Sequence, residues 1–214
     1  VGVWIGHSPG NKVLHNHIHD FYYTGISVGW VWGYAPSKAV GNLIEWNHVH
    51  DLGQGMLSDL GGIYTLGVSP GTRIRFNLFH DIRCRVYGGW GIYTDEGSTD
   101  ILIEKNIAYR CNRSGFHQHY GRDNLVQNNI FAFGDQEQVA RSRVEDHLSF
   151  TFRRNIVYYT KGQLVGRKSP EINCRFERNL YWNAAGRPLE FEGRGWQMWT
   201  ALGQDAGSIV ADPL

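Results

Sequence analysis

The sequence predicts an all-β chain that folds as a right-handed parallel β-helix, a solenoid of about seven coils with three short strands per coil. Three observations predict it. An asparagine recurs at intervals of 23 to 31 residues, apolar residues around it alternate with a period of two, and a glycine-led apolar segment follows most of these repeats. A period of two indicates strands, and self-similarity at a nearly fixed interval indicates a repeat architecture.

The asparagine segments share the pattern apolar-x-x-x-Asn-x-apolar and span residues 12–20, 43–51, 74–81, 102–110, 125–133, 152–160 and 174–182. Their central residues are Asn16, Asn47, Asn77, Asn106, Asn129, Asn155 and Asn179. Asparagine tolerates the left-handed backbone region, so we expect it to form a sharp bend between two strands. Its amide is then placed to hydrogen-bond to the same asparagine of the next coil.

The glycine-led strands are expected at residues 25–29, 62–66, 91–95 and 115–119, with a weaker copy at 163–166. No segment shows the 3.6-residue period of a helix. Aligning the copies predicts two inward columns, which contain Ile26, Ile63, Ile92 and Phe116, and then Val28, Thr65, Thr94 and Gln118. The outward columns contain Ser27, Tyr64, Tyr93 and His117, and then Gly29, Leu66, Asp95 and His119, which predicts a polar and aromatic face toward solvent.

Composition excludes several classes of protein. Apolar residues make up 42%, aromatic residues 14%, and the net charge is +1, which argues against a disordered chain and against a nucleic-acid partner. No apolar run of 18 or more residues is present, so no membrane span is predicted. Three scattered cysteines, Cys84, Cys111 and Cys174, are expected to be buried thiols.

The chain starts inside an apolar pattern at Val1 and stops at Leu214 without a polar tail. We therefore predict that residues 1–214 form a single β-helix domain and are an internal fragment of a longer protein. On this hypothesis its missing N- and C-terminal parts are its structural partners.

The candidate catalytic residues lie where glycine-led strands begin and end. Asp59 precedes one such strand, and Asp95 and Glu96 follow the next. Two carboxylates at one groove are the minimum for glycoside hydrolysis, although each aspartate is also placed to cap a turn. His119 falls in the column of Asp95, where a histidine can assist proton transfer or hold a sugar hydroxyl.

Aromatic and polar residues beside these acids are candidates for sugar binding, because aromatic rings stack on the apolar faces of pyranoses. The candidate substrate-binding residues are Trp30, Tyr64, Trp90, Tyr93, His117, Tyr120 and Arg122. Trp32 and Tyr34 lie in the same region, and part of this aromatic set is expected to pack under loops instead.

Other histidines repeat at equal register, in the pairs His19-Asp20, His50-Asp51 and His80-Asp81, with His17 and His48 as a further match. Such repetition favours a structural ladder over a column of metal ligands. His117 and His119 form a His-x-His pair that would put both rings on one face of a strand. No metal site and no cofactor are predicted.

Several long strings resemble the right-handed β-helix carbohydrate-active proteins, namely residues 5–11, 23–30, 58–67, 91–98 and 115–121. The chain resembles glycoside hydrolase family 141, whose known activities include α-L-fucosidase and xylanase. The resemblance implies a catalytic pair of aspartates, carried over onto Asp59 and Asp95. It also implies a secreted or periplasmic bacterial protein that acts on plant or microbial polysaccharide.

Spacing raises a difficulty for this pair. Relative to Gly62 and Gly91, Asp59 lies three positions before its strand and Asp95 four positions after the start of its own. Seven extended positions span about 23 Å, whereas a retaining pair needs about 5 Å and an inverting pair about 6.5 to 9.5 Å. The two aspartates meet only if the chain at Asp59 folds back, which Gly61 and Gly62 would permit; otherwise Asp95 would act with Glu96 or His119.

Two other functions stay open. A polysaccharide lyase or epimerase on the same fold would need a neutraliser of the uronate, for which Arg122 and Arg113 are candidates, while no cluster of three acids for calcium is expected on this face. A non-catalytic β-helix of the phage or adhesin type would bind glycan without turnover.

Overall fold

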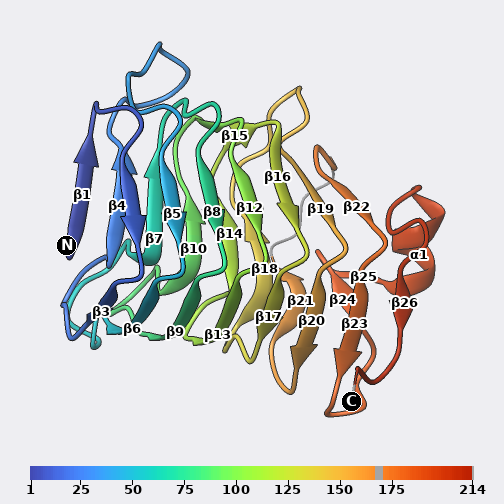
Figure 1. The fold of residues 1–214 in the computed structure, drawn as a ribbon. Coiled ribbons are helices and arrows are strands. Elements are labelled where there is room, and N and C mark those ends of the chain that lie inside the picture. The colour runs from blue at the N-terminus through green and yellow to red at the C-terminus, as the bar shows by residue number, and fades with distance from the viewer. Residues whose placement is uncertain (167–170, 214) are drawn as a thin grey trace.

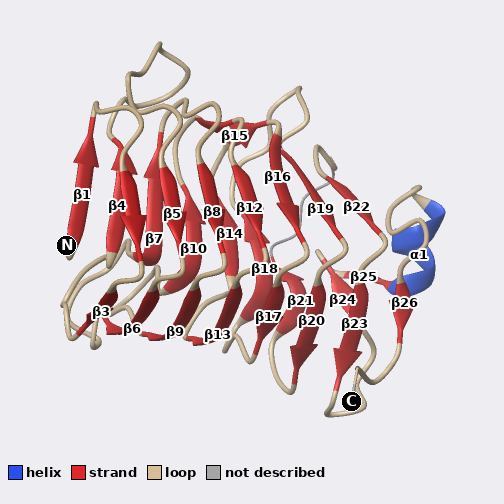
Figure 2. Ribbon diagram, in the orientation of Figure 1, coloured by secondary structure: helices blue, strands red, loops and turns tan. Residues whose placement is uncertain are grey.

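The structure, a computed structural model, describes residues 1–166 and 171–213 and is a parallel β-solenoid of about eight turns (Figure 1). Three sheets run along its length and enclose one continuous apolar core. Figure 2 shows how little of the chain is helical. The predicted β-helix with three short strands per coil is therefore confirmed.

The first sheet contains the glycine-led strands and has nine members, which are β1 (Val3–Gly6), β4 (Ile26–Gly29), β7 (Gly61–Leu66), β10 (Trp90–Thr94), β14 (Phe116–Gln118), β18 (Glu137–Arg141), β21 (Gln163–Gly166), β24 (Glu190–Phe191) and β25 (Arg194–Gly195). The second sheet has seven, which are β2 (Lys12–Leu14), β5 (Leu43–Glu45), β8 (Arg73–Arg75), β12 (Leu102–Glu104), β16 (Asn124–Gln127), β19 (Phe150–Arg153) and β22 (Arg175–Glu177). The third sheet has eight, which are β3 (His17–His19), β6 (His48–Leu52), β9 (Leu78–Ile82), β13 (Ile107–Cys111), β17 (Ile130–Ala132), β20 (Ile156–Tyr159), β23 (Leu180–Asn183) and β26 (Ile209–Val210). A short parallel pair, β11 (Ser98–Thr99) and β15 (Gly121–Arg122), connects the first sheet to the second in two successive coils.

The described residues contain one helix, α1 (Trp196–Ala201), which lies at the C-terminal end of the solenoid and which the sequence pattern did not predict (Figure 2). Its Trp199 is fully buried, stacks on Phe191 with ring centroids 5.2 Å apart, and donates its indole N–H to Asp205 at 2.7 Å. A six-residue helix is too short to show a period, but its tryptophan covers the end of the apolar core.

The predicted asparagine ladder is present along the inside of the bend between the second and third sheets. From Asn16 to Asn155, each asparagine donates its backbone N–H and its side-chain amide to the Oδ1 of the next one, at 2.9 to 3.4 Å. The eighth turn has no asparagine. Its Ser208 and Asp205 instead accept from Asn179 at 2.8 and 3.1 Å, which is why a count of asparagines gives one turn fewer.

The ladder asparagines do not themselves adopt the left-handed conformation, contrary to our expectation. The residue before each of them does, with φ between 53° and 60°, and these residues are His15, Trp46, Phe76, Lys105, Asn128, Arg154 and Arg178. Their side chains are of unrelated types. The asparagine amide therefore stabilises the bend by hydrogen bonding, and the strain of positive φ lies one residue earlier.

The leading glycines of the first sheet are required by close approach between coils. A Cβ on Gly91 would lie 2.7 Å from the carbonyl oxygen of Gly115 and 2.8 Å from the Ala108 side chain. Equivalent contacts of 2.7 to 2.8 Å join Gly25 to Gly62 and Gly62 to Gly91. No Cβ fits such a gap, so the coils that contain Gly25, Gly62 and Gly91 need glycine at this position.

We therefore expect Gly91→Ala to lower the free energy of unfolding by about 1–3 kcal/mol, because an added methyl group must displace backbone of the next coil. The measurement is urea unfolding followed by far-ultraviolet circular dichroism. Gly195→Ala is the matched control, since no atom lies within 4 Å of its Cβ position. Equal stability of the two variants would contradict the role given to the glycine column.

The predicted histidine ladder lies on the outer face of the third sheet. His17 pairs in register with His48, and His50 with both His19 and His80. The rings of His50 and His80 stack 4.8 Å apart, and His80 stacks in turn on Tyr109 at 4.7 Å. The ladder expected from equal register is thus observed.

Cys84, Cys111 and Cys174 are buried free thiols, as expected. Burial raises the pKa of Cys174 to about 12, so this thiol stays protonated at neutral pH. The part of the chain that the structure describes has no helix of the length and apolarity needed to cross a membrane.

Candidate active site

The outward columns of the first sheet have the predicted register, but most of their side chains are covered. Tyr64 pairs with Ser27 and Tyr93, and Tyr93 pairs with His117. Tyr64, Tyr93 and His117 are only 5%, 4% and 2% exposed. The expectation of an open polar and aromatic face is therefore wrong at these positions, because neighbouring rings and loops pack over them.

The loop before β7 folds back over the sheet, as the aspartate pair requires. Asp59 adopts φ 58° and its N–H donates to the Tyr87 carbonyl at 2.8 Å. The Gly89 N–H donates to the Leu60 carbonyl at 2.9 Å, so the loop is fastened to the loop of the next coil. The left-handed residue is Asp59 itself, whereas Gly61, expected to permit the turn, already belongs to β7.

Folding back brings Asp59 and Asp95 to one cavity of about 300 Å³. Its lining residues are Asp59, Tyr87, Trp90, Tyr93, Asp95, Glu96, His117, His119 and Ser142. The Tyr93 hydroxyl donates to Asp59 Oδ1 at 3.1 Å. The structure thus joins two carboxylates that sequence spacing alone left far apart.

Asp95 is 6% exposed and has one oxygen without a protein partner. Its Oδ2 accepts a hydrogen bond from the Tyr64 hydroxyl, and its backbone N–H donates to the Thr65 carbonyl at 2.8 Å. Its Oδ1 is buried and receives no hydrogen bond from any described residue. A buried carboxylate oxygen with no donor is costly, and a substrate hydroxyl or water in the cavity would relieve that cost.

Asp59 differs electrostatically from an exposed aspartate. Burial, and next the negative charge of Asp95, raise the pKa of Asp59, while the hydrogen bond from Tyr93 opposes the rise. Burial and both carboxylates also raise the pKa of Tyr93, which therefore remains a hydrogen-bond donor. The cavity favours a protonated Asp59 more than water would.

Ser142 links the two histidines of the site and was not predicted. Its hydroxyl oxygen lies 2.7 Å from His119 Nδ1 and 3.1 Å from His117 Nε2. The His117 ring stacks on Trp90 with centroids 4.1 Å apart. Ser142 and Tyr87 lie in loops, where no repeat register signals their position.

Four predicted substrate-binding residues do not line the cavity. Tyr64 lies behind Asp95, and Trp30 stacks on Tyr64 at 5.7 Å. Tyr120 donates its hydroxyl to Glu96 at 3.0 Å, and the Arg122 guanidinium lies over the Tyr34 ring at 5.4 Å. The first three therefore support the lining residues, and Arg122 lies on an adjacent surface.

Three acids, Asp59, Asp95 and Glu96, share this cavity, although the sequence led us to expect no such cluster. Among the described residues, however, the group of possible ligand atoms close enough to share one ion lies on the third sheet and consists of His17, His48 and His50. The cavity lining therefore presents carboxylate, imidazole and hydroxyl groups, all of which can donate or accept hydrogen bonds.

The family model for the right-handed β-helix region matches residues 1–191. No curated protein and no solved structure matched the chain.

Proposed function

The chain belongs to the right-handed β-helix region family, whose fold is typical of carbohydrate-active proteins, and on this premise we propose that it is a glycoside hydrolase. The observation that carries the proposal is the shared cavity of Asp59 and Asp95, with the Tyr93 hydroxyl bound to Asp59. The resemblance to glycoside hydrolase family 141 extends the proposal to an α-L-fucosidase or xylanase that acts on plant or microbial polysaccharide outside the cytoplasm.

In the proposed mechanism the two carboxylates have different roles. Asp59, whose pKa is raised, is the general acid that protonates the leaving oxygen of the glycosidic bond. Asp95, which lines the cavity beside Tyr93, is the carboxylate that attacks the anomeric carbon or activates water. His119, held by Ser142, positions a sugar hydroxyl or assists proton transfer.

The cavity gives no support to the lyase alternative. None of its described lining residues is Arg or Lys, and a lyase needs a cation to neutralise the uronate carboxylate. Arg122 is exposed near Tyr34, and Arg113 interacts with Glu137 at 3.8 Å, so both candidate neutralisers are outside the cavity.

The experiment that tests the proposal is an assay of fucosylated pectin and xylan oligosaccharides with product analysis by mass spectrometry. Hydrolysis adds water to the products, whereas a lyase yields an unsaturated sugar and a binding protein yields no product. The first result supports the proposal, and either of the others overturns it.

The pH profile provides a separate prediction. As the general acid, Asp59 must be protonated, so kcat should fall as pH rises through its pKa, which lies above the usual 3.8. Asp59→Asn should lower kcat on oligosaccharides by about 10²–10⁴-fold and much less on aryl glycosides, whose leaving groups need no proton. The variant should also lose the alkaline limb of the profile.

Asp100→Asn is the matched control, because Asp100 has the same φ of 58° as Asp59 but is exposed. It should leave kcat and the pH profile unchanged. An Asp59→Asn variant with equal losses on both substrate types would argue against the acid role.

A further inference from the structure

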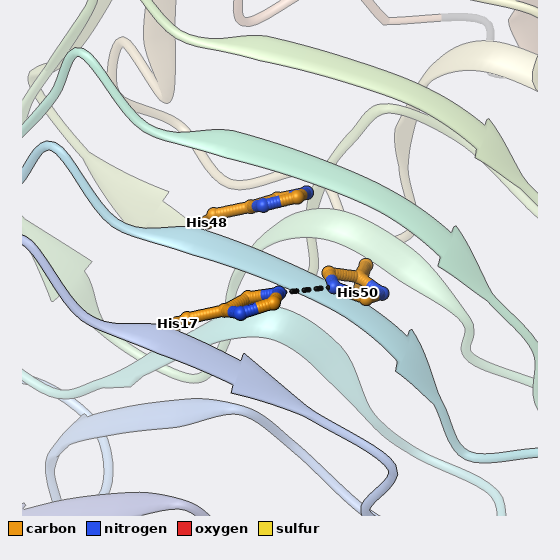
Figure 3. Close-up of side chains that lie close together, drawn as sticks. All are labelled: His17, His48 and His50. Atoms are coloured by element: carbon orange, nitrogen blue, oxygen red, sulfur yellow. Dashed lines mark hydrogen bonds between the residues drawn. The ribbon is translucent and has the colours of Figure 1, made fainter.

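Three imidazole rings converge on the outer face of the third sheet, away from the candidate active site (Figure 3). They belong to His17 on β3 and to His48 and His50 on β6. One ring nitrogen of each lies within 4.8 Å of those of the other two, and the Nε2 atoms of His17 and His50 are 2.6 Å apart.

The local sequence produces this convergence. Residues 17–19 and 48–50 read His-Ile-His and His-Val-His, so both histidines of each strand point outward while Ile18 and Val49 enter the core. Parallel register then places His17 beside His48. Because adjacent strands are about 4.8 Å apart, two neighbouring His-x-His strands bring several ring nitrogens within reach of one ion.

A carboxylate fixes the ring of His50. Its Nδ1 lies 2.6 Å from Asp51 Oδ2, so Nδ1 carries the hydrogen and the Nε2 lone pair faces His17. With this tautomer His17 Nε2 donates to His50 Nε2, so the hydrogen of His17 must shift to its Nδ1 before Nε2 can bind an ion. A carboxylate on the far nitrogen is the usual partner of a metal-ligating histidine, because it sets the tautomer and the ring orientation.

We propose that His17, His48 and His50 bind a divalent transition-metal ion of the zinc type. Imidazole nitrogens suit Zn²⁺, Cu²⁺ and Ni²⁺, whereas Mg²⁺ and Ca²⁺ prefer oxygen ligands. Three histidines leave the fourth position of a tetrahedral Zn²⁺ to water. The ion joins β3 to β6, and so fastens the first coil of the solenoid to the second.

The geometry requires small ring movements. Tetrahedral Zn²⁺ with bonds of about 2.0–2.1 Å separates its ligand nitrogens by roughly 3.3 Å. His17 and His50 must therefore move apart slightly, and His48 must exchange its contact with His80, where the Nε2 atoms are 2.8 Å apart, for the metal. His80 keeps a hydrogen-bonded partner without His48, because its Nδ1 contacts Asp81. Asp81 also accepts two hydrogen bonds from Arg110.

The test is zinc binding by the full chain prepared without a histidine tag and freed of metal by a chelator. Titration with ZnCl₂, by calorimetry and by competition with a chromophoric chelator, should show one ion per chain. Zinc should also raise the melting temperature in a concentration-dependent way, because it binds the folded state, and MgCl₂ should not. Absence of saturable binding would overturn the proposal.

Variants locate the site. His50→Gln should weaken zinc binding by more than 100-fold, and Asp51→Asn by about 10–100-fold because it removes the carboxylate that orients the His50 ring. His15→Gln is the control, since His15 is exposed on the same coil and stacks on Trp46 instead. Equal affinity of the His50 and His15 variants would show that the histidines form a ladder only. Should His50→Gln fail to fold, the exposed His17→Gln answers the same question.

Discussion

Replacing Asp95 with Asn should lower kcat by at least about 10³-fold on any oligosaccharide that the parent protein cleaves. Asparagine has the same shape and its Oδ1 still accepts a hydrogen bond from Tyr64, but it has no negative charge. The transition state of glycoside hydrolysis carries positive charge on the sugar, and a neutral amide neither attacks it nor activates water. The measurement is kcat from initial rates of product release.

Folding should change little, so the melting temperature separates a catalytic loss from a structural one. Asp100→Asn again serves as the control for an exposed aspartate replaced at a bend. If Asp95→Asn retains parental turnover, Asp95 is a turn-capping residue and the proposed mechanism fails. If substrate binding persists in the variant while turnover is lost, Asp95 is required for turnover, and a purely non-catalytic role for the parent is excluded as well.

The second large effect concerns the middle of the asparagine ladder. Asn106 accepts at Oδ1 from both the backbone and the side chain of Asn77, at 3.0 Å each, and donates to the Ile74 carbonyl at 2.9 Å. Asn106→Ala leaves two or three buried polar groups without partners, each costing about 1–3 kcal/mol. We expect the free energy of unfolding to fall by about 3–5 kcal/mol.

Asn16→Ala is the internal comparison. Asn16 is exposed and donates to Asn47, but no described residue donates to its side chain, so its loss should cost about 1 kcal/mol or less. Both variants would be measured by urea unfolding with fluorescence and circular dichroism. Similar midpoints for the two variants would show that the ladder adds little beyond strand pairing.

The coil register could be predicted because the same residue type returns at the same place in each coil. Asn77, Asn106 and Asn129 define the bend, and the glycine column defines the start of the first-sheet strands. The strand β18 (Glu137–Arg141) was missed because Gln138 occupies the position where earlier coils have the leading glycine. The helix α1 was missed because its tryptophans pack against the end of the core, where the sequence no longer follows the coil repeat.

The site could be predicted only in part. Asp95, Tyr93 and His117 were found because they lie in strand columns whose direction alternates. The burial of these three side chains could not be predicted, because it depends on loops whose sequences have no common pattern. Ser142 entered the site from such a loop, and Asp59 reached it through its own left-handed conformation, which sequence does not distinguish from an ordinary turn.

The direction of the asparagine ladder has a consequence for how such a chain can change by inheritance. Every ladder asparagine from Asn16 to Asn155 donates a side-chain N–H to the Oδ1 of the asparagine in the next coil, while the interval between neighbours varies from 31 to 23 residues. Duplicating or deleting one whole coil therefore leaves each remaining donor facing an acceptor. An insertion or deletion shorter than a coil keeps each donor opposite its acceptor only when it falls in a loop. Evolution can therefore change the loops and the number of turns, provided that each turn keeps one asparagine.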